Sequence, residues 1–149
     1  MSASTQRRDL LATLMPITRA LRRIEEAAAA RESLTMWQYA ILSVVAQSPG
    51  LNQREVAAYL QYSQNRIVAD LQALERLGLL TRQPGADRRA NRLASTTAGA
   101  TTQQRIQAAI HDREDQLLGG LSQPERDCFA LAARHLARQV REPLPSADP

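Results

Sequence analysis

The chain has 149 residues, which is enough to bury one sizeable hydrophobic core and gives no reason to expect two independent domains. Hydrophobic residues make up 44% of the sequence and aromatic residues only 3%, so the core must consist mainly of aliphatic side chains, which suits helix packing. The formal net charge of +4 favours an anionic partner without identifying one.

Cysteine content and hydropathy indicate the cellular compartment in which the protein is expected. A single cysteine, Cys128, excludes an intramolecular disulfide, and no apolar run approaches the roughly 18 residues that a membrane span needs. The N-terminus lacks an apolar stretch of signal-peptide length, so we expect a cytoplasmic protein with no membrane partner. Cys128 is expected to be a buried structural thiol rather than a peroxide sensor, because no second cysteine is present to resolve a sulfenate.

A first helix is predicted from about Arg7 to just before Ser33, because apolar residues recur four and three positions apart. These residues are Leu10, Leu14, Ile17, Leu21 and Ile24. Pro16 falls inside this stripe and is expected to kink the helix or delay its regular start, since proline cannot donate a backbone hydrogen bond.

Three further helix starts carry capping residues. Thr35 and Gln38 have the spacing of a capping box that opens the helix MWQYAILSVVAQ. Asn52 and Glu55 form a second cap pair before a short helix. Ser63 can cap the next helix. The buried face of that helix is predicted to contain Ile67, Leu71, Leu74 and Leu77.

Two short strands and two more helices complete the pattern. Residues 79–83 and 92–95 are predicted strands, joined by a turn over residues 84–91. Thr96 is expected to cap a long helix, and Ser122 with Glu125 to form a capping box before the last one. That last helix carries Phe129, Ala132, Leu136 and Val140 at helical spacing.

Helix, turn, helix and a two-stranded ribbon with a basic tip form the layout of a winged helix-turn-helix, which places one helix in the major groove of DNA. The predicted fold is therefore mainly α, with a small β wing, flanked by N- and C-terminal dimerisation helices whose apolar stripes one small lobe cannot cover. We divide the chain into an N-terminal dimerisation helix (1–33), a DNA-binding lobe (34–99), C-terminal dimerisation helices (100–141) and a disordered tail (142–149).

In this order of elements the chain resembles the MarR family of winged-helix transcriptional regulators. The family's second helix is matched by LTMWQYAIL, and its helix-turn-helix by NQREVAAYL and SQNRIVADLQALERLGLL. Its wing is matched by PGADRRANRLASTTAG, in which Asp87, Arg89, Thr96 and Gly99 keep the family spacing. Gln61-Tyr62 stands where the family has a small turn that often contains glycine. The resemblance implies a dimeric, sequence-specific DNA-binding repressor that a small aromatic ligand releases from a pseudo-palindromic operator.

Candidate DNA contacts lie first at the start of the presumed recognition helix. They are Ser63, Gln64, Asn65 and Arg66. Amide and guanidinium side chains there can read adenine and guanine edges in the major groove, and the alternative is a solvated helix N-terminus. Asp70, further along the same helix, is expected to be solvated or salt-bridged.

A second group of candidates lies in the wing. Arg88, Arg89 and Arg92 concentrate positive charge where it could contact phosphates or enter the minor groove, and the alternative is a soluble turn with surface arginines. The resemblance implies that the Asp87 carboxylate braces one of these arginines.

The resemblance also implies that Trp37 and Tyr39 lie beside a cleft for a small aromatic effector, although packing in the core or an interface is the better interpretation of either ring. His111 and His135 have no cluster of further ligands nearby in sequence, so we expect no metal and no cofactor. No motif supports catalysis, and we do not expect an enzyme. The alternative function is a winged-helix protein-interaction module without operator binding.

Overall fold

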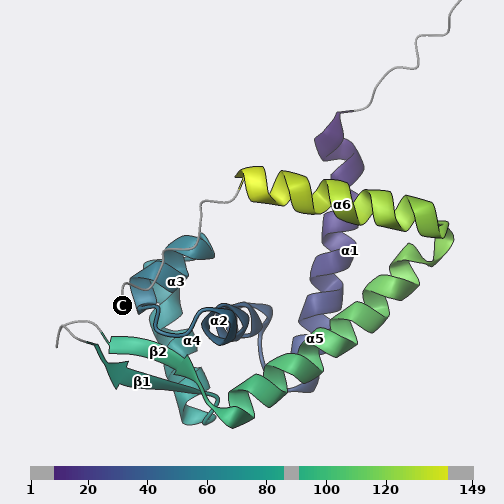
Figure 1. Cartoon of the computed structure of the whole chain (residues 1–149). Helices are drawn as coiled ribbons and strands as arrows, with labels where there is room; N and C mark the ends of the chain where they lie inside the picture. Colours follow the sequence, from purple (N-terminus) through teal and green to yellow (C-terminus); the bar gives the residue numbers. More distant parts are fainter. Residues whose placement is uncertain (1–8, 86–90, 141–149) are drawn as a thin grey trace, which may run out of the picture.

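The computed structural model describes residues 9–85 and 91–140. In order, the elements are α1 (Leu10–Arg31), α2 (Met36–Gln47), α3 (Gln53–Tyr59), α4 (Gln64–Arg76), β1 (Leu80–Pro84), β2 (Asn91–Ser95), α5 (Thr97–Leu117), the 3-10 helix η1 (Leu118–Gly120) and α6 (Gln123–Val140). Helices α2, α3 and α4 gather with the two strands in one lobe, from which α1, α5 and α6 extend (Figure 1). The predicted mainly helical fold with a small β wing is confirmed, and the tail at 142–149 lies outside the described residues.

Local capping explains where two helices of the lobe begin. The Thr35 hydroxyl accepts a hydrogen bond from the Gln38 backbone N–H, and the Gln38 side chain accepts one from the Thr35 N–H. Asn52 and Glu55 repeat this reciprocal pattern before α3. Each pair satisfies backbone donors that have no partner inside the helix. Ser63 also precedes its helix, but its side chain makes no capping hydrogen bond.

Two other helix starts differ from the prediction. Helix α1 begins at Leu10 and continues through Pro16, so the proline does not delay it, and the alternative of a kink at Pro16 stays a prediction. The missing N–H leaves the carbonyl of Ala12 without its helical donor, and this part of α1 is exposed, so water can replace it. Before α6 half of the predicted capping box is present, because the Glu125 carboxylate accepts from the Ser122 N–H at 2.8 Å. The Ser122 hydroxyl, however, donates to the same carboxylate at 2.8 Å, in place of the predicted acceptor role.

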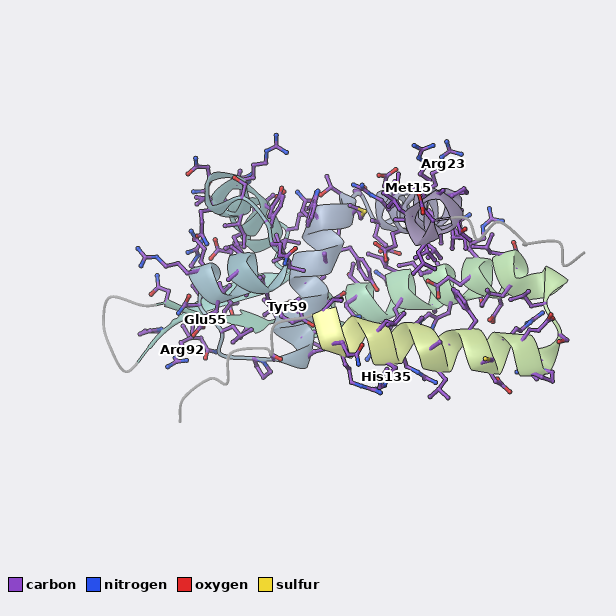
Figure 2. All side chains as sticks on the ribbon, turned by 90° about the horizontal axis from the view of Figure 1, so that it is seen from above. Met15, Arg23, Glu55, Tyr59, Arg92 and His135 are labelled. Atoms are coloured by element: carbon purple, nitrogen blue, oxygen red, sulfur yellow. The ribbon has the colours of Figure 1, made fainter. Side chains whose placement is uncertain are left out.

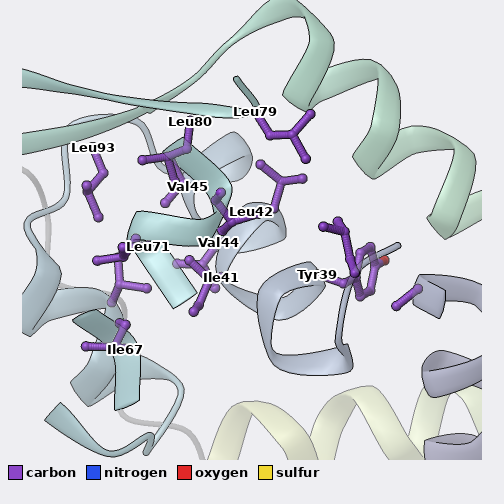
Figure 3. Close-up of a cluster of buried hydrophobic side chains, with 14 of the residues drawn as sticks. Tyr39, Ile41, Leu42, Val44, Val45, Ile67, Leu71, Leu79, Leu80 and Leu93 are labelled. Carbon is purple, nitrogen blue, oxygen red and sulfur yellow. The ribbon is translucent and has the colours of Figure 1, made fainter. Parts of the chain in front are cut away.

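The core of the lobe is made of aliphatic side chains from the helices and from both strands (Figure 3). Its fully buried members are Ile41, Leu42, Leu51, Ile67, Leu71, Leu74, Leu80, Leu93, Ile106, Val45 and Val56. Leu77 was predicted on this face but is 53% exposed, because it follows the last turn of α4 at the edge of the apolar stripe. The core fixes one face of α4 inward and leaves the opposite face outward.

The wing is tied to the lobe through its returning strand. Strands β1 and β2 are antiparallel, with Leu80 opposite Ser95 and Pro84 opposite Asn91, within one residue of the predicted bounds. The Leu93 backbone also exchanges hydrogen bonds with the segment before α3, donating to the Leu51 carbonyl and accepting from the Gly50 N–H. The root of the wing therefore has three hydrogen-bonded backbone segments.

A large apolar surface remains uncovered on the extended helices. Leu10 and Leu11 of α1 are 60% and 70% exposed, and Leu136 and Val140 of α6 are 56% and 79% exposed. Viewed from above, α1, with Met15 and Arg23, lies on the side of the molecule away from the strands and Arg92 (Figure 2). No helix among the described residues is long and apolar enough to cross a membrane.

Cys128 lies on α6 and is exposed, so the predicted buried thiol was wrong. The helical repeat places it away from the stripe of Phe129, Leu136 and Val140, and nearly every side chain of α6 is exposed in the protomer.

Candidate nucleic-acid interface

The outward face of α4 is the face opposite the buried Ile67, Leu71 and Leu74. With about 100° of rotation per residue, it consists of Asn65, Ala69, Gln72 and Arg76, all of them exposed. Gln72 and Arg76 were not among the sequence candidates, although their spacing of seven and eleven residues from Asn65 could have identified them.

The four predicted contacts at the start of α4 are Ser63, Gln64, Asn65 and Arg66, and all are exposed. Only Asn65 lies on the outward face as defined here; Arg66 lies on its flank, whereas Gln64 falls on the side of Leu71. Their side chains are accessible to a ligand at this helix end, and their contact with DNA stays a prediction.

The turn that leads into α4 has a strained backbone. Gln61 has a φ of +49°, a left-handed conformation that glycine adopts most easily. Its N–H donates to the Ala58 carbonyl, and the Tyr62 N–H donates to the Ala57 carbonyl. These bonds close the end of α3 and direct the Tyr62 side chain toward α2.

Tyr62 connects α2 to α4. Its ring stacks on Trp37 with centroids 4.2 Å apart, and its hydroxyl donates to Asp70 Oδ2 at 2.7 Å. Gln38 Nε2 donates to Asp70 Oδ1 at 3.2 Å. Asp70 is therefore half-buried and hydrogen-bonded, neither solvated nor salt-bridged as predicted, because the fold brings two donors to it. Partial burial, followed by the bond to Asp70, raises the pKa of Tyr62 above its usual 10.0, so the hydroxyl remains a donor.

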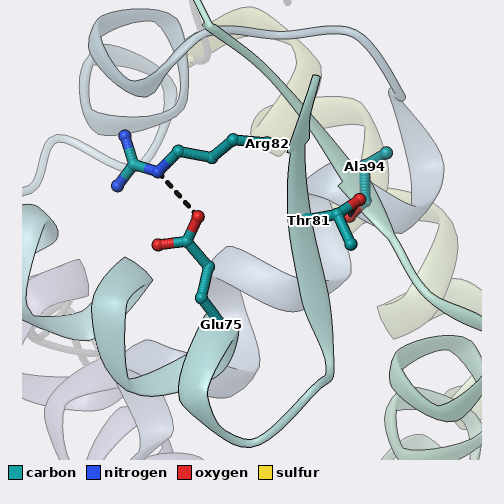
Figure 4. A network of polar contacts seen from close by, with 4 residues as sticks. All are labelled: Glu75, Thr81, Arg82 and Ala94. Atoms are coloured by element: carbon teal, nitrogen blue, oxygen red, sulfur yellow. Dashed lines mark hydrogen bonds and ion pairs between the residues drawn. The ribbon is translucent and has the colours of Figure 1, made fainter.

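A second carboxylate of α4 is also held by a neighbouring element. Glu75 Oε1 accepts from Arg82 Nε of β1 at 2.8 Å (Figure 4). On the opposite side of the same strand, the Thr81 hydroxyl donates to the Ala94 carbonyl at 3.4 Å. Helix α4 and the wing are thus joined by an ion pair as well as by the apolar core.

In the wing, Arg92 has an intramolecular partner that its sequence position did not suggest. Its Nη1 donates to the Gly50 carbonyl at 2.8 Å, which adds to the backbone bonds at the root of the wing. Asp87, Arg88 and Arg89 lie outside the described residues, so their predicted roles are untested.

The predicted effector residues point to different parts of the molecule. Trp37 packs on Tyr62 beside α4, whereas Tyr39 is buried at one end of the core cluster (Figure 3). Burial raises the pKa of Tyr39, with Ser43 and Gln103 beside its hydroxyl. Both rings therefore take part in packing.

A separate groove of about 380 Å³ lies between α1 and α5. Its lining consists of Arg23, Ile24, Ala27, Ala28, Arg31, Ala109, Arg113, Gln116 and Leu117. Three guanidinium groups beside aliphatic side chains suit a small ligand that has an anionic group and an apolar body. Within the described residues, no group of three or more His, Cys, Asp or Glu could hold a metal ion.

Comparisons with known proteins agree with this geometry. The sequence profile of the MarR family matches residues 33–90. A protein of Thauera aromatica, assigned as a transcriptional regulator of the hcr operon, is 31% identical over 112 residues, which cover 74% of this chain and 68% of that protein.

Similar solved structures cover almost the whole chain. A crystal structure of MarR has a TM-score of 0.80 and 27% identity, covering 93% of this chain and 95% of that one. CouR, a transcriptional repressor bound to a 23-mer DNA duplex, has a TM-score of 0.74 and 30% identity, covering 87% of this chain and 92% of that one.

Proposed function

Since this chain belongs to the MarR family of transcriptional regulators, we propose that it is a homodimeric repressor that binds a pseudo-palindromic operator in double-stranded DNA. The observation that carries the proposal is the outward face of α4, where Asn65, Gln72 and Arg76 are exposed on a helix held between the core and the wing. Amide and guanidinium groups on such a face are suited to base edges and phosphates. CouR, the relative bound to DNA, supports the same role.

Dimerisation is proposed from the uncovered apolar stripes of α1 and α6. Exposed leucines such as Leu10 and Leu136 are unfavourable in water and favour burial against a second copy. A two-fold dimer presents two copies of α4 to one duplex face, so the half-site centres should lie about 10 base pairs apart.

The proposal places the protein in the cytoplasm, as a DNA-binding protein without catalytic activity. The lack of an intramolecular disulfide is compatible with a reducing compartment. The alternative, a protein-interaction module without operator binding, makes the opposite prediction for DNA.

Selection of duplexes from a randomised pool by the purified protein, followed by footprinting, tests the proposal. We expect a two-fold symmetric footprint and a log affinity that falls with log salt by about 0.9 per phosphate contact. Replacing Arg88 and Arg89 together by alanine should weaken binding; Arg134 and Arg138 of α6, replaced together, provide a control with the same charge change. Failure to select any duplex would support the interaction module, and unchanged affinity in the wing variant would remove the wing from the interface.

We also propose that a small aromatic carboxylate regulates DNA binding from the groove between α1 and α5. Arg23, Arg31 and Arg113 supply donors for its carboxylate, and Ile24 and Leu117 supply apolar contacts for its ring. Such a ligand weakens repression only if it binds the DNA-incompetent arrangement of the two lobes of the proposed dimer, one from each copy, better than the competent one.

Salicylate is a suitable probe for this regulation, because it is a small aromatic carboxylate. Trp37 is the sole tryptophan, so the fluorescence of the protein reports on the lobe. We expect salicylate to lower DNA affinity by about 5- to 150-fold, and DNA to lower salicylate affinity by the same factor. Arg23→Gln should weaken salicylate binding. Binding of salicylate without any change in DNA affinity would show that the groove has no regulatory role.

A further inference from the structure

Helix α4 contains two acidic residues, Asp70 and Glu75. Side chains from outside the helix bind both carboxylates at the flanks of its outward face. Glu75 is paired with Arg82 of β1 at 2.8 Å. Asp70 has one donor for each carboxylate oxygen, Tyr62 at 2.7 Å and Gln38 at 3.2 Å. Neither carboxylate lies on the outward face, which carries only neutral and basic side chains.

The two donors to Asp70 are themselves fixed. The Tyr62 ring lies on Trp37 with an interplanar angle of 15°, so the hydroxyl has a defined position. The Gln38 amide uses its oxygen to cap α2 through the Thr35 N–H, at 3.0 Å, which aims its nitrogen at Asp70. A packed ring and a capping box therefore set the rotamer of one carboxylate on α4.

This arrangement has an electrostatic consequence for a polyanionic ligand. Arg66 lies one helical turn before Asp70 and is exposed, so a freely rotating Asp70 carboxylate could pair with it or approach the same phosphates. Like charges at the edge of a DNA interface reduce affinity, and the effect grows as salt is lowered.

We propose that Tyr62 is a positioning residue for DNA binding, whose hydroxyl, together with Gln38, keeps the Asp70 carboxylate away from the DNA phosphates. The proposal rests on the proposed function. The positioning role explains why Gln61-Tyr62 stands in place of a small turn. The strained backbone at Gln61 precedes a side chain, Tyr62, that holds a carboxylate of α4 in place.

The test compares Tyr62→Phe, Asp70→Asn and the double variant on a duplex selected by the wild-type protein. Tyr62→Phe retains the ring and its stack but removes the shorter of the two hydrogen bonds to the Asp70 carboxylate, leaving the bond from Gln38. We expect about 3- to 10-fold weaker binding, a typical coupling for residues in contact. The loss should increase at low salt. Asp70→Asn alone should bind as the wild type does, and in the Tyr62→Phe background it should restore affinity to within about twofold.

A second variant tests the same carboxylate from the other side. Gln38→Glu retains an acceptor for the Thr35 N–H, since glutamate also completes a capping box, but replaces the donor to Asp70 with a second carboxylate that repels it. It should weaken DNA binding and should also be rescued by Asp70→Asn. Circular dichroism and Trp37 fluorescence check that each variant is folded. If Tyr62→Phe does not fold, Gln38→Glu provides the test of whether the position of the Asp70 carboxylate affects DNA binding.

The outcomes separate this proposal from the broader one. Unchanged affinity in Tyr62→Phe would overturn the role of Tyr62 alone, and a loss that Asp70→Asn does not rescue would show that Tyr62 only packs the turn. A wild-type protein that selects no duplex would refute DNA binding itself, and the positioning role with it.

Discussion

Thr96 and Gly99 join the end of the wing to the start of α5. The Thr96 hydroxyl accepts from the Gly99 N–H at 3.0 Å and donates to the Gly78 carbonyl at 2.6 Å, while the Thr96 N–H donates to the Leu79 carbonyl. The first turn of α5 is thereby pressed against the start of β1. A Cβ atom on Gly99 would overlap with the Leu79 carbonyl oxygen and lie 2.7 Å from Ser95 Oγ, so only glycine allows this approach.

Replacing Gly99 with alanine should therefore destabilise the fold. We expect Gly99→Ala to lower the free energy of unfolding by about 1–3 kcal/mol, because backbone on both sides must shift. Gly119→Ala is the matched control, since a Cβ there meets no atom within 4 Å. Urea denaturation measures both variants, and equal stability would contradict the close packing at Gly99.

At the scale of elements, the contact between α1 and α5 holds two carboxylates close to each other. Partial burial raises the pKa of Glu25 above the usual 4.5, and repulsion from Glu114 raises it further, while Arg22 opposes the shift. A carboxyl with a raised pKa in the folded state disfavours folding when it is charged. Its unfavourable contribution is present at neutral pH and is relieved as pH falls through the raised pKa toward 4.5.

Glu25→Gln should therefore be more stable than the wild type at pH 7, with the difference shrinking as the pH approaches 4.5. Glu26→Gln removes the same charge from the exposed side of α1 and should not reproduce this pH dependence. Thermal unfolding across this pH range measures the effect. A difference that grows toward acid pH would reverse the sign assigned to Glu25.

At the scale of the whole molecule, α1 and α6 expose the side chains that a small protein normally buries. The stripe of α6 consists of Phe129, Leu136 and Val140, which are 38%, 56% and 79% exposed. Leu131 is 63% exposed but lies on the opposite side of the helix, near Asp127 and Arg134. A second copy that packs on the stripe would distinguish these two leucines.

Leu136→Glu should dissociate the proposed dimer, because it places a charge in an apolar interface, whereas Leu131→Glu should leave the dimer intact. Light scattering at micromolar concentration measures the mass of each variant. Equal dissociation by both substitutions would show that the contact is not confined to the stripe, and a monomeric wild type would contradict the dimer.

Elements that depend on residues a few positions apart could be predicted from sequence. Thr35 and Gln38, and Asn52 and Glu55, are three residues apart, and both pairs cap helices as predicted. The apolar repeat likewise identified the helices, because a helical period of about 3.6 residues is a local property. The sequence alone therefore established the order of elements, the winged-helix fold and the family.

The tertiary structure decided which side chains meet across elements. Asp70 has Gln38 as a partner 32 positions away, and Arg92 bonds to Gly50 over 42 positions. Neither separation has a periodic signature, because such contacts depend on the angles at which helices and strands pack. The same packing exposes Cys128 and leaves an outward face of α4 without carboxylates. Sequence periodicity thus located α4, and packing determined which charges it presents.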